Sequence, residues 1–419
     1  MKGERKHITV FEHQSIKLNQ KIDEVVFDIN KLKALQKFYG DKGVPYFSLI
    51  HEGVRFNEHV GVIQVGETLI EVLPKADKHG EKEKWREVLI GMIRAVGLFE
   101  IHAPSSSNLK LKPNSILDLY FELFINETEY LLHNGLIKKY RKKEGNVFAL
   151  KGRILFGKNI QQNINHQERF FVEHTTYDFE HLLHFIIYKT IRLLKSINTN
   201  SSLQSRICSL LLHFPEMPDI KVTEETFQKI NFNRKTECYS KSIEIAKLLL
   251  LHYHPDISRG RNNVLALMFD MNKLWESFIY VSLKNDKAIK RTVTGQTSKY
   301  FWKQDNHNRT SIKPDIVINK GDSNNCIVLD TKWKMILNNN PSPDDLRQLY
   351  VYHEYYKAKK VALVYPGESI LKTSGKYLDP NTGEQLNKEC SVITLSVDKQ
   401  IKAWQKNISN EIETWINQN

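Results

Sequence analysis

Two short apolar runs near the C-terminus constrain the fold more than any other feature of this sequence. They are KPDIVI, ending at Ile318, and CIVLD, ending at Asp330, and the turn-rich NKGDSNN joins them. Such runs favour buried strands, and the connection favours a hairpin. In a hairpin centred near Asp322, Asp315 and Asp330 lie opposite each other. Lys332, two residues after Asp330, points to the same side of the sheet.

This group of two carboxylates and one ammonium fits the hydrolysis of a phosphodiester bond. Directly opposed residues have Cβ atoms roughly 4.5 to 5.5 Å apart, close enough for both carboxylates to bind one divalent cation. A hard cation such as Mg²⁺ or Mn²⁺ supplies a Lewis acid and orients the attacking water, while Lys332 stabilises charge on the phosphate. The alternative is a solvated ion pair of Asp330 and Lys332 on an ordinary strand, because a PD dipeptide and a D-x-K are each common.

The segment around these runs predicts the order helix, three strands, helix, strand. MNKLWESFIYVSL, from Met271, has helical spacing, RTVTGQTSKYFW, from Arg291, is strand-like, and VALVY, from Val361, is a further strand. The second helix is predicted to open at Ser342, a suitable N-cap residue, with Pro343 at its first position. We then expect a polar loop over residues 374–389, a strand over residues 390–397 and a C-terminal helix.

The chain before residue 255 predicts a β-rich part followed by a mainly helical one. Residues 1–75 are strand-like, and Gly61–Pro74 is typical of a hairpin turning at Gly66 and Glu67. A chain of 419 residues is long for one core, so two or three domains are expected. Apolar residues at helical spacing predict helices over residues 85–96, 114–138, 179–196, 201–213 and 240–252.

KPDIVI followed by IVLDTKWK resembles the signature of the PD-(D/E)XK nucleases, and the order of elements around it resembles their core. The resemblance implies that Asp315 and Asp330 hold a metal ion and that Lys332 is catalytic. Glu276, in MNKLWESFIY, matches a helix-borne acid that helps many of these enzymes hold the metal or its water. The alternative for Glu276 is a surface acid.

Gln348 and Tyr352 lie one helical turn apart and resemble the QxxxY motif of the RecB-like branch, which is associated with contacts to DNA. The alternative is one face of an amphipathic helix. Some RecB-like nucleases also carry a four-cysteine iron–sulfur cluster with three cysteines after the core. Only Cys390 follows the core here, so we expect no cluster.

Segments along most of the chain resemble the McrC family in order: VGVIQVGETLIEVLPK, NGLIKKY, LKGRILFGKNIQQN and MNKLWESFI. The resemblance implies an α+β multidomain protein. Its parts would be a β-rich N-terminal docking domain (1–110), a mainly helical middle region (111–255) and a C-terminal α/β restriction-endonuclease-like domain (256–419). It also implies an endonuclease subunit of a McrBC-type restriction complex, active in phage defence, that cleaves double-stranded DNA and stimulates the GTPase of a McrB-like AAA+ ring.

Two alternatives remain at this point. One is a stand-alone RecB-like exonuclease or repair nuclease, and the other is a non-catalytic activator of an AAA+ ring. The resemblance places ring docking in the N-terminal hairpin, whose apolar residues exceed what one buried face needs. Its alternative is that the domain's own elements cover both faces. With docking there, deletion of residues 1–110 is expected to abolish ring binding and to leave the C-terminal part folded.

The remaining features restrict cofactors and compartment. The net charge of +13 favours a polyanionic partner. No GxxxxGK[ST] phosphate loop occurs, so we expect this chain to bind no nucleotide itself. Charges interrupt every apolar run and the N-terminus resembles no signal peptide, so we expect a cytoplasmic protein without membrane contact.

The sequence leaves open the roles of two groups of side chains. The basic run of residues 138–153 is suited to DNA phosphates, to an acidic rim of the partner, or simply to solvent. The histidines, His181, His184, His252 and His254 among them, lack metal-ligand spacing and are expected in the core or on the surface.

Overall fold

The computed structural model forms two compact units with a mixed α/β fold. One unit is the middle of the chain, Ile101–His254 with Met1–Glu4, and the other combines Arg5–Glu100 with Pro255–Asn419. The structure describes residues 6–66, 68–77, 80–96, 116–198, 200–251, 253–254, 264–286, 291–303, 309–322, 325–336 and 340–418. No helix among these residues is long and apolar enough to cross a membrane.

The N-terminal sheet contains the predicted hairpin. Strands β7 (His59–Val65) and β8 (Thr68–Leu73) pair antiparallel with Val65 opposite Thr68, which leaves two residues for the turn. Gly66 in that turn has a positive φ of 58°, as a tight hairpin requires, while Glu67 lies outside the described residues. On one side β1 (Lys6–Phe11) joins β8 in parallel, and on the other β13 (Val264–Asp270) joins β7 antiparallel.

This hairpin leaves no apolar surface free, contrary to the prediction. Its alternating residues Ile63, Val65, Ile70 and Val72 belong to the core of the N-terminal sheet. The residues on the other face are also buried, and helix α2 (Lys82–Ala95) packs against β8. The expectation of an exposed docking face on this hairpin was therefore wrong, because the domain's own elements cover both faces.

The same N-terminal part holds smaller elements, among them a helix that the strand-like pattern did not predict. Helix α1 (Ile29–Tyr39) begins at Asp28, whose side chain accepts hydrogen bonds from the backbone N–H groups of Asn30 and Lys31. It buries Leu32 and Leu35 against the sheet core. The short strands are β2 (Ser15–Lys17), β3 (Lys21–Ile22), β4 (Val25–Val26), β5 (Phe47–Ile50) and β6 (Gly53–Phe56).

The C-terminal sheet has the order β14-β17-β18-β19-β21-β20. Strands β18, β19 and β21 run parallel, and the outer pairs are antiparallel. Every residue of β18 is buried, as the apolar run predicts. The strands are β14 (Val293–Gly295), β17 (Ile316–Ile318), β18 (Ile327–Thr331), β19 (Lys360–Gly367), β20 (Leu371–Leu378) and β21 (Gln385–Ser396).

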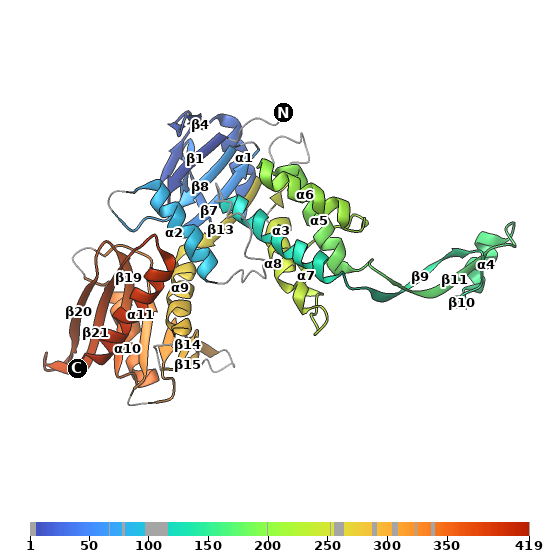
Figure 1. Ribbon diagram of the computed structural model, residues 1–419. Coiled ribbons are helices and arrows are strands. Elements are labelled where there is room, and N and C mark those ends of the chain that lie inside the picture. Colours follow the sequence, from blue (N-terminus) through green and yellow to red (C-terminus); the bar gives the residue numbers. More distant parts are fainter. Residues whose placement is uncertain are drawn as a thin grey trace. The chain divides into compact units, whose positions relative to one another are not determined.

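Helices cover both faces of this sheet (Figure 1). Helix α10 (Pro343–Tyr356) packs on one face through Leu349 and Tyr352, and Ser342 caps it as predicted by accepting from the backbone N–H of Asp345. On the other face lie α9 (Met271–Asn285) and α11 (Ile401–Asn417). Residues 374–389, predicted as a loop, form most of the β20–β21 hairpin instead. Strand β20 is an exposed edge strand, so its polar sequence is indistinguishable from that of a loop.

The middle unit is built on four helices that pack on one another, close to their predicted positions. They are α3 (Ile116–Asn134), α5 (Leu182–Ile197), α6 (Ser201–His213) and α8 (Ser240–Leu251). Short elements complete the unit: α7 (Glu224–Gln228), a 3-10 helix (Glu237–Tyr239) and β12 (Tyr253–His254).

A long β-ribbon leaves these helices, and the sequence did not predict it (Figure 1). Strands β9 (Lys139–Val147) and β11 (Phe170–Asp178) pair over their whole lengths, and β10 (Arg153–Ile154) and α4 (Phe156–Asn163) lie at the far end. We call this ribbon with its end the arm, residues 139–178. Val172 is the only fully buried residue of its two strands, and the strands carry no apolar alternation, which is why the pattern gave no strand signal.

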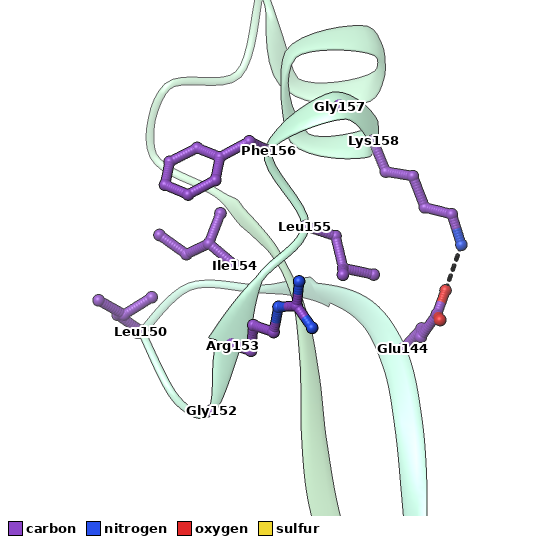
Figure 2. A pocket seen from close by; sticks show the side chains of 9 residues that line it. All are labelled: Glu144, Leu150, Gly152, Arg153, Ile154, Leu155, Phe156, Gly157 and Lys158. Carbon is purple, nitrogen blue, oxygen red and sulfur yellow. Dashed lines mark hydrogen bonds and ion pairs between the residues drawn. The ribbon is translucent and has the colours of Figure 1, made fainter.

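A pocket lies at the tip of the arm (Figure 2). Figure 2 shows the apolar side chains of Leu150, Ile154 and Phe156 on one side of it. The ion pair of Glu144 and Lys158 lies on the other side.

Candidate active site

The β17–β18 hairpin has the register that the sequence predicts. Ile316 pairs with Leu329, Val317 with Val328 and Ile318 with Ile327. One step further out, this register sets Asp315 opposite Asp330. Asp315 precedes β17, and its Oδ2 accepts hydrogen bonds from the backbone N–H of Thr331 at 2.6 Å and from the Thr331 hydroxyl at 2.9 Å. Those bonds hold the Asp315 carboxylate against the end of β18.

Asp330 is a buried carboxylate with a charged partner. Only 1% of the residue is exposed, and its Oδ2 lies 2.7 Å from Nζ of Lys332. Burial raises the pKa of Asp330, the charge of Asp315 raises it further, and the Lys332 ammonium opposes both effects. Burial lowers the pKa of Lys332, but the charge of Asp330 and its hydrogen bond outweigh that effect and raise it. The Lys332 ammonium is therefore stabilised by Asp330, while burial disfavours ionisation of the Asp330 carboxyl group.

Gln348 and Tyr352 of α10 reach this pair. The side-chain amide of Gln348 donates to Asp330 Oδ1 at 3.3 Å and to the Tyr352 hydroxyl at 2.7 Å. The Tyr352 hydroxyl donates in turn to the backbone carbonyl of Lys313 at 3.2 Å. Because Tyr352 is only 2% exposed, these contacts orient the residues of the site, and a direct contact of either side chain with DNA stays a prediction.

Glu276 approaches from α9. Its Oε1 accepts from the Gln296 side-chain amide at 2.9 Å, and Gln296 Oε1 accepts from Nζ of Lys313 at 2.8 Å. Burial raises the pKa of Glu276, and the charge of Asp315 adds to this, which places the two acids within electrostatic reach of each other. The sequence did not predict Gln296. Gln296 comes directly after Gly295 and has a positive φ of 48°. Nothing in the residue pattern indicates that it links α9 to the hairpin.

The donor set suits a small, hard cation. The described residues contain no group of three or more His, Cys, Asp or Glu side chains already gathered to hold a metal ion. Thr331 and Lys332 occupy oxygens of Asp315 and Asp330, respectively. Mg²⁺ needs only one or two protein carboxylates because it keeps several waters. Burial is the main reason that the pKa values of Asp330 and Glu276 are raised, and the negative charge of Asp315 raises both further.

A tryptophan beside the site connects it to the N-terminal sheet, and sequence reasoning missed this contact. Trp333 follows Lys332, and its indole Nε1 donates to Oε1 of the buried Glu12 at 2.8 Å. Its backbone N–H donates to the side chain of Asn272, and its ring packs edge-on against Trp275.

Two of the histidines singled out from the sequence, His181 and His184, belong to the middle unit. His181 and His184 are buried in the middle unit, where their rings hydrogen-bond to the backbone carbonyls of Ile137 and Phe179, as expected of core histidines. Of the other two histidines, His252 and the His254 side chain lie outside the described residues. All four cysteines are unbridged, with Cys208 and Cys238 exposed and Cys326 and Cys390 buried.

A family model and a curated relative both match this chain to the McrBC restriction systems. A family model described as McrBC 5-methylcytosine restriction system component matches residues 54–366. The type IV methyl-directed restriction enzyme EcoKMcrBC of Escherichia coli (strain K12) is 23% identical over 205 residues. That alignment spans 48% of this chain and 57% of the relative's length.

A solved structure shares the fold. It is a half-complex from a tetradecameric assembly of Thermococcus gammatolerans McrB AAA+ hexamers with bound McrC, with a TM-score of 0.67 and 20% sequence identity. The match covers 98% of this chain and 100% of that one. The likeness therefore extends over both units of the chain.

Proposed function

The chain belongs to the McrBC family of restriction-system components, and on that premise we propose that it is an McrC-type nuclease subunit that cleaves double-stranded DNA with a divalent cation. We propose further that residues 256–419 form its PD-(D/E)XK nuclease domain, with Asp315, Asp330, Lys332 and Glu276 as its active-site residues. The cofactor would be Mg²⁺ or Mn²⁺, with no iron–sulfur cluster and no nucleotide bound by this chain.

One observation carries this proposal: the hairpin register sets Asp315 opposite the buried Asp330, and Lys332 lies 2.7 Å from Asp330. Two opposed carboxylates on neighbouring strands destabilise a sheet unless something neutralises them. A buried acid at the end of a central strand likewise needs a partner, and Lys332 supplies only one positive charge for two carboxylates. A divalent cation resolves both costs.

Each residue of the candidate site has a separate role in the proposed cleavage of the phosphodiester bond. A bound divalent cation supplies Lewis acidity and lowers the pKa of a bound water. Asp315 and Asp330 would hold it, with Glu276 acting on it or on its water. Lys332 stabilises negative charge on the scissile phosphate, and its ion pair with Asp330 keeps the ammonium in place. Gln348 fixes the second oxygen of Asp330 and aligns the tyrosine behind it.

Two substitutions test the site. Asp330→Asn and Lys332→Ala are expected to lower the rate of DNA cleavage by at least about 100-fold, the scale of losing one charge-stabilising group, while leaving stimulation of the ring's GTPase intact. Lys334→Ala is the matched control, because Lys334 pairs with Asp345 at 2.7 Å and not with Asp330. Cleavage should require Mg²⁺ or Mn²⁺ and stop in excess EDTA. Full cleavage by either site variant, or undiminished cleavage in EDTA, would refute the proposal.

We also propose that this subunit works with a McrB-like AAA+ GTPase ring, since the similar solved structure contains McrC bound to Thermococcus gammatolerans McrB AAA+ hexamers. Since no phosphate loop occurs in this chain, GTP hydrolysis would come from the ring. Cleavage assays with and without the ring separate the alternatives. A stand-alone RecB-like nuclease cleaves without the ring, and a non-catalytic activator never cleaves but still stimulates hydrolysis.

The tip of the arm is the surface we assign to ring docking. Phe156, Ile160 and Ile164 recur every four residues along α4 and its C-terminal end, and each is more than 60% exposed. Phe148 and Leu150 beside them are also exposed. An uncovered apolar stripe on a helix fits a groove on another protein.

Part of the basic run of residues 138–153 is already neutralised within the arm. Arg141 pairs with Asp178 and Lys142 with Glu173 across the ribbon, so part of its charge is already matched within the arm. The pairing lowers the charge that Arg141 and Lys142 offer to any anionic partner, so the docking assignment rests on the apolar stripe of α4.

A further inference from the structure

A two-stranded ribbon beside the candidate site exposes an unusual group of side chains. We call β15 (Lys299–Lys303) with β16 (Arg309–Ile312) the flanking ribbon. Every residue of β15 is exposed, and three of the five are aromatic. Tyr300 is 67% exposed, Phe301 45% and Trp302 54%.

Trp302 differs in this respect from every other tryptophan of the chain. The sequence has six tryptophans, and the other five are at most 7% exposed: Trp85, Trp275, Trp333, Trp404 and Trp415. A two-stranded ribbon is only marginally stable alone, and leaving large aromatic faces in water adds to that cost. Such a ribbon is best explained by a ligand that covers the aromatic faces.

The charges around these aromatic rings define the ligand. From Lys299 to Lys313 the sequence carries four cations and one acid, Asp305. The Arg309 guanidinium lies 5.0 Å from the centre of the Tyr300 ring, in cation–π geometry. Phe301 already has a partner within the chain, because its ring lies 5.4 Å from that of Tyr355. Aromatic faces among cations are what single-stranded nucleic acid binds, with bases stacked on rings and phosphates near ammonium groups.

The ribbon is also tied to the residues that would cleave the backbone. Strand β16 ends at Ile312, three residues before Asp315, which limits their separation to about 10 Å of extended chain. Lys313, between them, donates to Gln296, and Gln296 donates to Glu276. Tyr300 and Trp302 pair with Ser311 and Thr310, four and five residues before Asp315, so at most about 13 to 17 Å of extended chain separates these positions from Asp315. A DNA strand a few nucleotides long can span that distance.

We propose that the flanking ribbon binds unpaired bases of a DNA strand next to the scissile phosphate, with Tyr300 and Trp302 as stacking platforms and Lys303 and Arg309 near the phosphates. This inference rests on the proposed nuclease function. The inference adds to that function a requirement for a locally unpaired strand, because the base faces of an intact duplex are already stacked.

Tryptophan fluorescence offers a direct test, because Trp302 alone supplies a solvent-exposed signal. The full chain is titrated in EDTA, without any ring, with oligo(dT) and with a blunt duplex of equal length. Oligo(dT) is expected to quench the exposed component, and the duplex much less. Trp302→Phe should lose the quench yet keep the affinity within about twofold. Trp302→Ala should weaken oligo(dT) binding at least about fivefold, the lower limit for one stacked base.

A matched control and the contrary outcomes complete the design. Leu378→Ala removes another exposed apolar side chain, 60% exposed on edge strand β20, and should leave oligo(dT) binding unchanged. The proposal is overturned if oligo(dT) produces no quench, or if Trp302→Ala binds it as tightly as the parent. If Trp302→Ala bound the ring more weakly but kept the parent's affinity for oligo(dT), the ribbon would be a protein-docking surface instead. Since EDTA blocks cleavage, quenching stands or falls independently of nuclease activity.

Discussion

Burial and hydrogen bonding act in opposite directions on Glu12, the acid that holds the tryptophan beside the candidate site. Its carboxylate accepts from the Trp333 indole and from the backbone N–H of Lys75, both at 2.8 Å, and these bonds favour the ionised form. Burial dominates, however, and raises the pKa of Glu12 to about 7. The folded protein thus holds a proton here that the unfolded chain releases at lower pH.

The sign of the pH effect on stability follows. Because the folded pKa is raised, the protonated carboxyl contributes stability that is fully present below the unfolded value near 4.5 and is lost as pH rises through about 7. Glu12→Gln keeps an acceptor for Trp333 and removes the titration. Its stability relative to the parent should therefore rise between pH 5 and pH 8, by at most about 3 kcal/mol. Urea unfolding at both pH values measures this, with the exposed Glu384→Gln as control. Parallel pH dependence of parent and Glu12→Gln would contradict it.

At the residue scale, the sequence predicts contacts that a short turn determines and misses those between distant segments. The opposition of Asp315 and Asp330 follows from one hairpin and its centre. Glu12 and Trp333 are 321 residues apart, and Gln296 reaches Glu276 only through a turn with an unusual backbone angle. No local periodicity encodes either contact.

At the scale of elements, a helix or strand can be predicted from the sequence when it buries one face. The helices α5, α6, α8 and α10 bury one side and were predicted within a few residues. Strand β20 and the strands of the arm bury almost none of their residues, so no alternation of apolar and polar residues predicts them.

The arm tip yields a prediction at this scale. The double substitution Phe156→Asp with Ile160→Asp puts two charges on the exposed stripe of α4 and should weaken binding to a McrB-like ring at least tenfold, with a parallel loss of GTPase stimulation. Folding should be unaffected, because both side chains are already in water. Leu212→Asp, on α6 of the same unit and 80% exposed, is the matched control. Co-purification with the ring and GTP turnover are the measurements, and unchanged binding would move the docking surface elsewhere.

At the scale of the whole molecule, the unit that holds the candidate site is assembled from two segments far apart in the sequence, Arg5–Glu100 and Pro255–Asn419. Strand β13, from residue 264 onward, pairs with β7 in the N-terminal sheet. Helices α2 and α11 approach so closely at Gly91 that a Cβ there would lie 2.2 Å from Cγ1 of Ile401. The middle unit is thus an insertion between two segments that share one core. Sequence patterns mark where apolar runs begin and end, but not which of them pair across 200 residues.

This shared core changes the expected result of truncation. Deleting residues 1–110 removes the partner strand of β13 and the Glu12 acceptor of Trp333, so we no longer expect the C-terminal part to stay folded alone. Residues 256–419 expressed by themselves should lack a cooperative urea transition. Co-expression with residues 1–100 should restore it, because the two fragments together contain the whole unit. Residues 116–251, which belong to the middle unit, should not substitute for them. A cooperative transition of residues 256–419 alone, with binding of Mg²⁺ retained, would show instead that this segment folds independently of the N-terminal sheet.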